Sequence, residues 1–272
     1  MTCVQIRYYT DPACPWSWAL EPSLRRLQTE FGDALQFEYV MAGMGDALQD
    51  GPHMALQALE AADRSGMPVD VRIWLRDPPT SSQAAGMAVK AASEQGDPGP
   101  YLRRLREGFF CRGRRLDNLE ALLAEARQLP AIDLERFRIA LSSHGVLELL
   151  GEDLERARRV ASEHHSETEG RVVLPSLEFC GADGAVNGVY GYGPYDELRQ
   201  AALAAGAVSG ALSVDVDQAL QRFGVLSTAE VSTLCRLPGP TAAATLWQLA
   251  AEWRVSPERC GGGELWTLAQ TG

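Results

Sequence analysis

Lysine is almost absent from this chain of 272 residues. Lys90 is the one lysine among 25 basic residues, and the formal net charge is −11 at pH 7. Because binding to phosphates needs a positive field, this charge argues against nucleic acid as the main partner. No apolar run approaches the roughly 20 residues that span a bilayer, so we expect no membrane segment. The first residues lack a basic region followed by an apolar stretch, which predicts no signal peptide and a cytoplasmic location.

Closely spaced cysteines are missing as well. The six cysteines are scattered, and none lies within a redox-like or metal-like pair: Cys3, Cys14, Cys111, Cys180, Cys235 and Cys260. In a cytosolic chain of this size we expect free thiols, several of them buried. The adjacent His164 and His165 have no acidic or cysteine residues at metal-ligand spacing, so we expect no metal site.

The most informative segment is Asp-Pro-Ala-Cys-Pro-Trp-Ser-Trp, at residues 11–18. It follows a short apolar run and opens a helix whose apolar residues recur at helical spacing: Leu20, Leu24, Leu27 and Phe31. Cys14 is therefore expected at a helix N-terminus, where unpaired N–H groups and the helix dipole favour a thiolate. Pro15 suits the first helical turn, which needs no N–H. This is the layout of a Cys-X-X-Cys redox site in which Ser17 replaces the second cysteine.

Hydrophobic patterning divides the rest of the chain into strands and amphipathic helices. The predicted elements, in chain order, are strands over 3–9 and 35–41, helices within 53–165, a hairpin over 171–179 and 185–190, and a helix beginning near Pro194. The last sixty residues predict three short helices and a strand over 264–268, with a capping box that begins at Ser227.

A β-α-β start, a helical block and a returning hairpin with a helix describe an α/β protein with a thioredoxin fold and a large all-helical insertion. We assign residues 1–52 and 166–206 to the thioredoxin-fold domain and residues 53–165 to the inserted helical domain. Residues 209–272 are predicted to form a small, helical C-terminal module that resembles a winged helix. The thioredoxin fold predicts a cis peptide bond facing the cysteine, and Leu174–Pro175 is the candidate.

The segment around Cys14 resembles the active site of DsbA-like thioredoxin-fold proteins. The nearest match is the FrnE-type branch of predicted disulfide isomerases, in which Cys-Pro-Trp-Cys-Trp is followed by Glu-Pro. Trp18 and Glu21-Pro22 match that pattern here. The resemblance covers residues 1 to about 205. It implies thiol–disulfide exchange, with Cys14 as the nucleophile and Pro175 as the cis-proline.

Ser17 limits the activity that this resemblance implies. A serine hydroxyl cannot resolve a mixed disulfide as a second thiolate does, but it can donate a hydrogen bond to the Cys14 thiolate. We therefore expect an oxidoreductase or isomerase that acts as a monothiol on a protein or small-molecule thiol or disulfide. No tightly bound cofactor is expected, and glutathione is a candidate co-substrate. The catalytic residues expected are Cys14, Ser17 and Pro175, and the substrate contacts are Pro15, Trp16 and Leu174.

Two other functions stay open. Kappa-class transferases and chromene-carboxylate isomerases share the inserted fold and carry Ser-Pro at the equivalent turn, which implies a glutathione-dependent enzyme. DsbA-like proteins also include protease adaptors, so a non-catalytic binding protein is the third interpretation. A homodimer is among the assemblies that we consider.

An arginine-rich run either binds acidic groups, such as the carboxylates of glutathione, or pairs with acidic residues of the chain: Arg103, Arg104, Arg106, Arg112, Arg114 and Arg115. The C-terminal module is acidic, which favours a protein contact or packing on the thioredoxin domain over DNA binding. Cys111 and Cys3 are candidates for a substitute resolving thiol. Trp18 is expected in the core.

Overall fold

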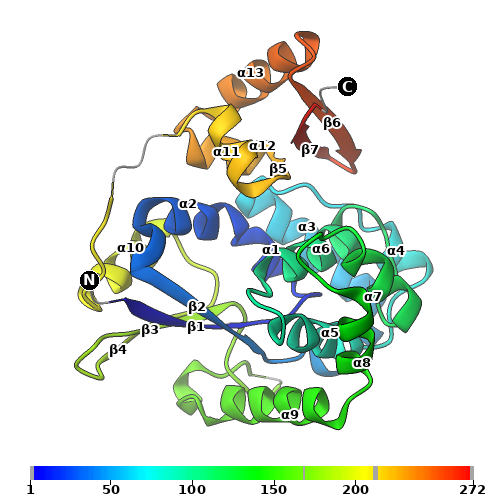
Figure 1. Ribbon diagram of the computed structural model, residues 1–272, viewed down its shortest axis with the longest axis vertical. Helices are drawn as coiled ribbons and strands as arrows, with labels where there is room; N and C mark the ends of the chain where they lie inside the picture. Colours follow the sequence, from blue (N-terminus) through cyan, green and yellow to red (C-terminus); the bar gives the residue numbers. More distant parts are fainter. Residues whose placement is uncertain (1–2, 168, 211–213, 270–272) are drawn as a thin grey trace.

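The computed structural model describes residues 3–167, 169–210 and 214–269. Its main sheet has the strand order β2-β1-β3-β4 (Figure 1). The central strand β1 (Val4–Thr10) runs parallel to β2 (Leu35–Met41) and antiparallel to β3 (Ser176–Cys180), and β3 pairs with β4 (Val186–Tyr190). The mixed sheet of the predicted thioredoxin fold is confirmed.

The hairpin begins later than its sequence pattern predicts. The expected strand over 171–179 starts only at Ser176. Pro175 has no N–H to donate to a ladder, so a strand cannot run through it without losing a hydrogen bond. Upstream of the proline, Val172 forms an isolated bridge with His165 instead.

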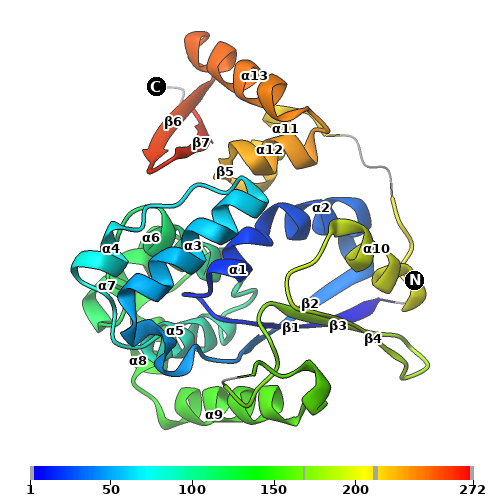
Figure 2. The same cartoon turned by 180° about the vertical axis from the view of Figure 1, so that it is seen from behind.

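Helices cover both faces of the main sheet. α2 (Glu21–Phe31) and α10 (Tyr195–Ala204) lie on one side, while α9 (His144–Arg159) lies on the other (Figures 1 and 2). On the α2 side, alternating residues of β1 share one core with residues of α2, β3 and α10. The β1 residues are Val4, Ile6 and Tyr8, and the others include Leu24, Leu27, Phe179 and Leu198. This alternation follows from the two-residue period of a strand.

The helix predicted after Cys14 is broken into two. α1 (Pro15–Ala19) ends at Leu20, and this residue is also the N-cap of α2. Pro22 lies in the first turn of α2 and has no N–H, so it cannot continue the hydrogen-bond ladder of α1. The Glu-Pro pair of the motif therefore marks the start of a second helix.

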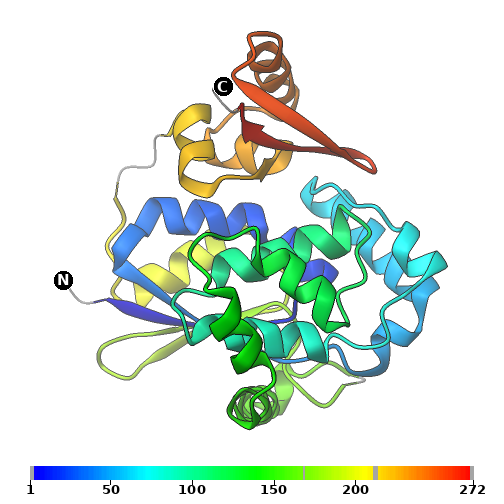
Figure 3. The same cartoon turned by 45° about the vertical axis from the view of Figure 1, so that its right-hand side comes forward.

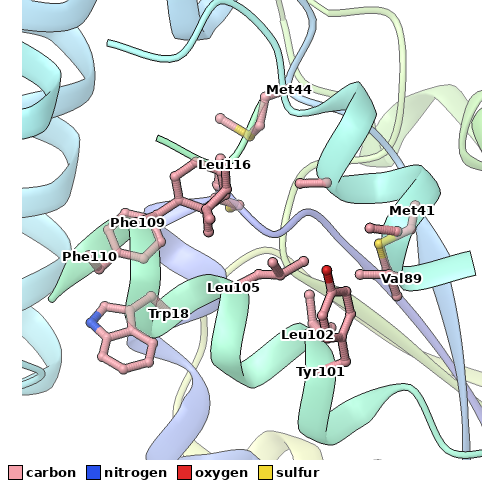
Figure 4. Packing of buried hydrophobic residues seen from close by; sticks show 14 of the residues in the cluster. Trp18, Met41, Met44, Val89, Tyr101, Leu102, Leu105, Phe109, Phe110 and Leu116 are labelled. Carbon is pink, nitrogen blue, oxygen red and sulfur yellow. The ribbon is translucent and has the colours of Figure 1, made fainter. Parts of the chain in front are cut away.

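The block between β2 and β3 is helical, as predicted. Its helices are α3 (Gly51–Ser65), α4 (Arg72–Arg76), α5 (Gln83–Ser93), α6 (Gly99–Phe110), α7 (Leu119–Ala126), α8 (Leu134–Leu141) and α9, with short 3-10 turns at η2 (Gly45–Gln49) and η3 (Ser162–His164). Its core includes residues of the sheet and of α1, with Trp18 stacked on Phe110 at 6.0 Å between ring centroids (Figure 4). The helical block and the sheet thus share one core, and the domain boundaries stay a prediction.

The C-terminal module (residues 216–268) has a core of its own, with Leu220, Val231, Leu246 and Trp266. Its elements are α11 (Val216–Phe223), β5 (Leu226–Ser227), α12 (Thr228–Leu234), α13 (Gly239–Ala251), β6 (Val255–Cys260) and β7 (Gly263–Leu268). The capping box at Ser227 is present, and the predicted terminal strand lies within β7. β6 had no sequence signal, because proline and three polar residues interrupt its apolar pattern. The small-residue-rich segment over 206–213, whose composition is typical of a linker, lies partly outside the described residues.

Candidate functional site

Cys14 lies where the sequence placed it, at the N-cap of α1. Its backbone is extended (φ −77°, ψ 116°), and its Sγ accepts a hydrogen bond from the Ser17 N–H at 3.4 Å. Strand β1 ends at Thr10 and the chain turns at residues 11–14, which brings the thiol to the edge of the sheet. The N-cap position follows from Pro15, which can occupy only the first turn of a helix.

The expectation of a favoured thiolate at Cys14 is wrong. The side chain is only 2% exposed. Burial raises the pKa of the Cys14 thiol, and the hydrogen bonds from Ser17 offset this effect only in part. The nearby Asp11 carboxylate raises the thiol pKa further, while Arg171 lowers it. A helix of five residues contributes a small dipole, so desolvation decides the outcome.

Ser17 is fully buried and belongs to a chain of hydrogen bonds that ends on an arginine. The Arg106 guanidinium donates to Thr10 Oγ1, and the Thr10 hydroxyl donates to Ser17 Oγ at 2.8 Å. With its lone pair engaged, Ser17 can direct its own proton toward Cys14 Sγ, in line with its lowering effect on the Cys14 pKa. The donor role expected for Ser17 therefore fits this geometry, and its part in catalysis stays a prediction.

The Leu174–Pro175 peptide bond is cis, as the sequence predicts. It immediately precedes β3, whose first residue, Ser176, pairs with Tyr9 of β1. The cis bond and the turn after β1 therefore lie at the same edge of the sheet. The Leu174 side chain belongs to the same buried cluster as Cys14. The catalytic role of Pro175 and the substrate contact of Leu174 stay predictions.

Trp16 and Trp18 have different surroundings. Trp18 is fully buried and donates its Nε1–H to the Pro68 carbonyl at 2.9 Å, so the expectation of a core residue is confirmed. Trp16 is half-buried, donates to Gln57 Oε1 at 2.8 Å, and lies 5.4 Å from the ring of Tyr192. Tyr192 follows β4 and was missed by the sequence analysis, because a tyrosine between two glycines carries no signal of its own. Pro15 is buried.

Asp11 was also missed. Its carboxylate is buried and accepts hydrogen bonds from Ser82 Oγ and the Ala13 N–H, both at 2.7 Å. Burial raises the pKa of Asp11 to about 6, although these hydrogen bonds lower it. Asp11 also lines a cavity of about 800 Å³ together with Ser82, Arg158 and Arg171. Asp11 belongs to the turn that carries Cys14, although Cys14 itself is not among the residues that line this charged cavity.

Within the described residues, no group of His, Cys, Asp and Glu side chains could hold a metal ion. His164 instead stacks on the Tyr190 ring at 3.6 Å, and a ring nitrogen of His165 lies 2.8 Å from the Val160 carbonyl oxygen. No helix among the described residues is long and apolar enough to cross a membrane.

The arginine-rich run pairs with acids of the chain. Arg103 contacts both oxygens of Glu230, at 2.6 and 2.9 Å, and also contacts Glu21 and Glu107. Arg106 contacts Glu21 as well. We call these buried residues the Arg103 cluster: Glu21, Arg103, Arg106, Glu107 and Glu230. Of the two uses proposed for these arginines, internal pairing is the one observed, and it joins α2 and α6 to α12 of the C-terminal module.

The sheet, the cis-proline and the buried N-cap cysteine together define a DsbA-like thioredoxin-fold protein, a fold that thiol–disulfide oxidoreductases use. A thioredoxin family model matches residues 8–168. The chain therefore belongs to that thioredoxin family. The FrnE-type branch stays a prediction.

Two curated relatives are named ClpXP adapter protein SpxH. The protein of Halalkalibacterium halodurans is 32% identical over 169 residues, which cover 58% of this chain and 55% of that protein. The protein of Bacillus subtilis is 28% identical over 202 residues, covering 72% of this chain and 66% of the relative. The matches thus span about half to two thirds of the length of these relatives.

Among solved structures, the fold is similar to that of the cytosolic disulfide reductase DsbM from Pseudomonas aeruginosa. The TM-score is 0.55 at 20% identity, and the match covers 68% of this chain and 88% of that one. At this identity the likeness concerns the fold alone.

Proposed function

We propose that this protein binds a polypeptide as an adaptor of the ClpXP type, and that Cys14 does not turn over as a redox catalyst. The state of the Cys14 thiol carries this proposal. It is buried, its pKa is raised, and Ser17 occupies the position of a resolving cysteine. The names of the curated relatives support the same role. The ClpXP partner and a cytoplasmic location are parts of the proposal.

The chemical argument concerns nucleophilicity. The thiolate attacks a disulfide, whereas the thiol does not. A raised pKa keeps Cys14 protonated at neutral pH, and a side chain that is 2% exposed offers no path for a disulfide of another protein. Both conditions disfavour thiol–disulfide exchange at Cys14, and neither prevents the surrounding surface from binding a polypeptide.

The surface that we assign to binding is centred on Trp16 and Tyr192. Tyr192 is 36% exposed, and Trp16 is held by Gln57 of α3. The preceding residue on that helix, Leu56, is 53% exposed. Aromatic rings with an apolar body and a polar tip are typical of protein interfaces. The pair also lies next to the turn that carries Cys14, where thioredoxin folds meet their substrates.

The test uses the full chain and purified bacterial ClpXP in sedimentation-velocity experiments. We expect wild type and Cys14→Ala to bind ClpXP equally, and Trp16→Ala and Tyr192→Ala to weaken binding at least about tenfold, since interface aromatics often contribute about 2 kcal/mol or more. Trp247→Ala, at an exposed tryptophan of α13, is the matched control. The same runs report whether the free chain forms the homodimer, which stays a prediction.

Two outcomes would contradict this proposal. One is an absence of binding by a folded wild-type chain. The other is disulfide turnover by wild type that exceeds the turnover of free cysteine and is lost in Cys14→Ala. The second result would establish the monothiol enzyme instead.

That enzyme is the second candidate, and the cavity lined by Asp11 favours it. The arginines of its wall, Arg158 and Arg171, suit the carboxylates of glutathione. In this reaction the Cys14 thiolate attacks the glutathione sulfur of a mixed disulfide between glutathione and a substrate thiol. A Cys14–glutathione mixed disulfide forms, and the substrate leaves as its thiolate. A free glutathione thiolate then attacks this mixed disulfide, which releases the Cys14 thiolate and gives glutathione disulfide.

Intact mass spectrometry separates the two candidates. The adaptor proposal expects no added glutathionyl group on Cys14 after treatment with glutathione disulfide at neutral pH. The monothiol enzyme requires one such group, which Cys14→Ala would lack. In the enzyme, Ser17→Cys would discharge the group, because the introduced thiol would close an internal disulfide with Cys14.

A further inference from the structure

Two buried cysteines from distant parts of the chain meet beneath the C-terminal module. Cys111 is the C-cap of α6 in the helical block, and Cys260 is the last residue of β6. Cys260 Sγ lies 3.7 Å from the carbonyl oxygen of Phe110, the residue before Cys111, although the two are 150 residues apart in the chain. Cys111 Sγ donates to the Pro68 carbonyl while Cys260 Sγ donates to the carbonyl of the residue before Cys111, so the two thiols are close neighbours.

The backbone around this pair is tightly fixed. Cys111 Sγ lies 3.6 Å from the Pro68 carbonyl oxygen, and both cysteines belong to the same buried cluster. Gly261, directly after Cys260, has a positive φ of 49°, and a Cβ there would lie 1.9 Å from the Val69 carbonyl oxygen. The turn between β6 and β7 therefore rests on the helical block, as Figure 3 shows.

An ion pair on the solvent side of the two cysteines also connects β6 to the end of α6. Arg112 Nε and a terminal nitrogen each donate to one oxygen of Glu258, both at 2.9 Å. Arg112 follows Cys111 in the chain, and Glu258 lies two residues before Cys260 on β6. A bidentate pair of this kind fixes orientation as well as distance, so the two cysteine side chains approach each other in one arrangement.

We propose that Cys111 and Cys260 form a disulfide under oxidising conditions and so tie the C-terminal module covalently to the helical block. Hydrogen peroxide is a sufficient oxidant. One cysteine thiolate attacks a peroxide oxygen, which gives a sulfenic acid and hydroxide. The second thiol displaces the sulfenic oxygen, so that the S–S bond forms and water leaves. Two thiols and one peroxide thus give one disulfide and two waters.

The docked state protects the pair from this reaction. Burial raises the pKa of Cys111 well above its ordinary range, and the neighbouring Cys260 thiol raises it further. The first oxidation step therefore proceeds when the module opens, and closure brings the second thiol to the sulfenic acid. Loosening the Arg112–Glu258 pair should speed the formation of the disulfide. This inference is independent of the proposed function.

The test is peptide mapping of the whole chain after treatment with hydrogen peroxide. Trypsin should release residues 107–112 and 260–272 as one disulfide-linked pair that separates on reduction. The linked pair should disappear in Cys111→Ser and in Cys260→Ser, and should persist in Cys180→Ser and Cys14→Ala. Glu258→Gln should form it several times faster than wild type, since it breaks only the exposed ion pair.

Wild type alone keeps the proposal falsifiable if a buried Cys→Ser variant fails to fold. Oxidised wild type should unfold at a temperature roughly 5 °C above the reduced form, because the cross-link restricts the unfolded chain. The proposal is overturned if both cysteines of folded, peroxide-treated wild type are recovered as free thiols or as separate oxidised peptides. It is also overturned if Cys111 is found linked to Cys14.

Discussion

The Cys14 turn and the Arg103 cluster are both buried and polar, yet the net pKa shifts of their acidic groups have opposite signs. At Cys14, the removal of water raises the thiol pKa, because the neighbouring hydrogen bonds from Ser17 only partly offset it. At Glu21 of the Arg103 cluster, burial alone would also raise the carboxyl pKa, but Arg25, Arg103 and Arg106 lower it to about 2. The sign of the net shift thus depends on whether a full opposite charge is in contact.

Arg106 connects the two regions. One of its terminal nitrogens contacts Glu21, and the other contacts Thr10, whose hydroxyl donates to Ser17. The charge of Arg106 reaches Cys14 only through two hydroxyl groups. The hydroxyls of Thr10 and Ser17 orient the hydrogen bonds near Cys14, whereas the direct contact of Arg106 with Glu21 stabilises the ionised carboxylate. This difference predicts where substitutions should have large effects and where small ones.

The largest effect is expected at Glu230. Glu230→Gln keeps the shape of the side chain and its capping position but leaves Arg103 short of a buried carboxylate. We expect a loss of about 4 kcal/mol in the free energy of unfolding, measured with urea. Glu258→Gln, at a half-exposed ion pair, is the matched control and should cost less than about 1 kcal/mol. Equal costs would show that the cluster adds nothing beyond a surface pair.

Acid should weaken the Arg103 cluster through Glu21. Its folded pKa of about 2 lies below the ordinary value of 4.5, so its stabilising contribution is complete above pH 4.5 and is lost as the pH falls toward 2. The loss should reach about 3 kcal/mol. Urea titrations between pH 6 and pH 2 measure it, with Glu21→Gln as the reference that lacks this slope. A slope that Glu21→Gln retains would assign the effect to other carboxylates.

Asp11 should respond to pH in the opposite direction. Its folded pKa of about 6 lies above the ordinary value of 3.8, so the folded state binds the proton more tightly and gains stability as the pH falls from about 6 to 4. Asp11→Asn should remove this gain and raise the stability at pH 7 by about 2 kcal/mol. Ser82→Ala removes a hydrogen-bond donor to Asp11. It tests whether that bond accounts for any difference in stability between Asp11→Asn and wild type. A less stable Asp11→Asn chain at pH 7 would contradict the sign.

The smallest effect is expected at Ser17. Ser17→Ala removes the hydroxyl that lowers the Cys14 thiol pKa, so alkylation of Cys14 by iodoacetamide should slow roughly tenfold at pH 8. Cys3 is exposed and reports the rate of an unprotected thiol in the same sample. Thr10→Val should give a part of the same slowing, since Thr10 acts on Cys14 only through Ser17. Unchanged alkylation in Ser17→Ala would remove Ser17 from the site.

Local patterns predicted the elements that depend on neighbouring residues. The strand over 35–41 matches β2 residue by residue, because alternation is a property of the strand itself. The turn at Cys14 and the cis bond at Pro175 followed from a short motif and from the fold that it implies. The interruption at Leu20 was missed, although Pro22 was visible in the sequence.

Contacts between distant residues left no such pattern. Arg103 and Glu230 are 127 residues apart, and neither position shows by itself that it is buried. The arginine run could therefore be predicted only as two alternatives. The same reason hid the approach of Cys260 to the end of α6 at Cys111, because cysteine spacing along a chain does not report distance in a folded core. The direction of the Cys14 pKa shift was predicted wrongly, because the burial of this side chain depends on the packing of the whole helical block.

Gly261 has a consequence for how this protein tolerates mutation. Any side chain at this position would clash with the carbonyl of Val69 and push the β6–β7 turn away from it. The positive φ of Gly261 is a second reason why other residues are disfavoured there. Gly261→Ala would thus separate two parts of the protein without removing a single polar group. The docking of the C-terminal module should consequently tolerate substitution least at Gly261, although this residue has no side chain.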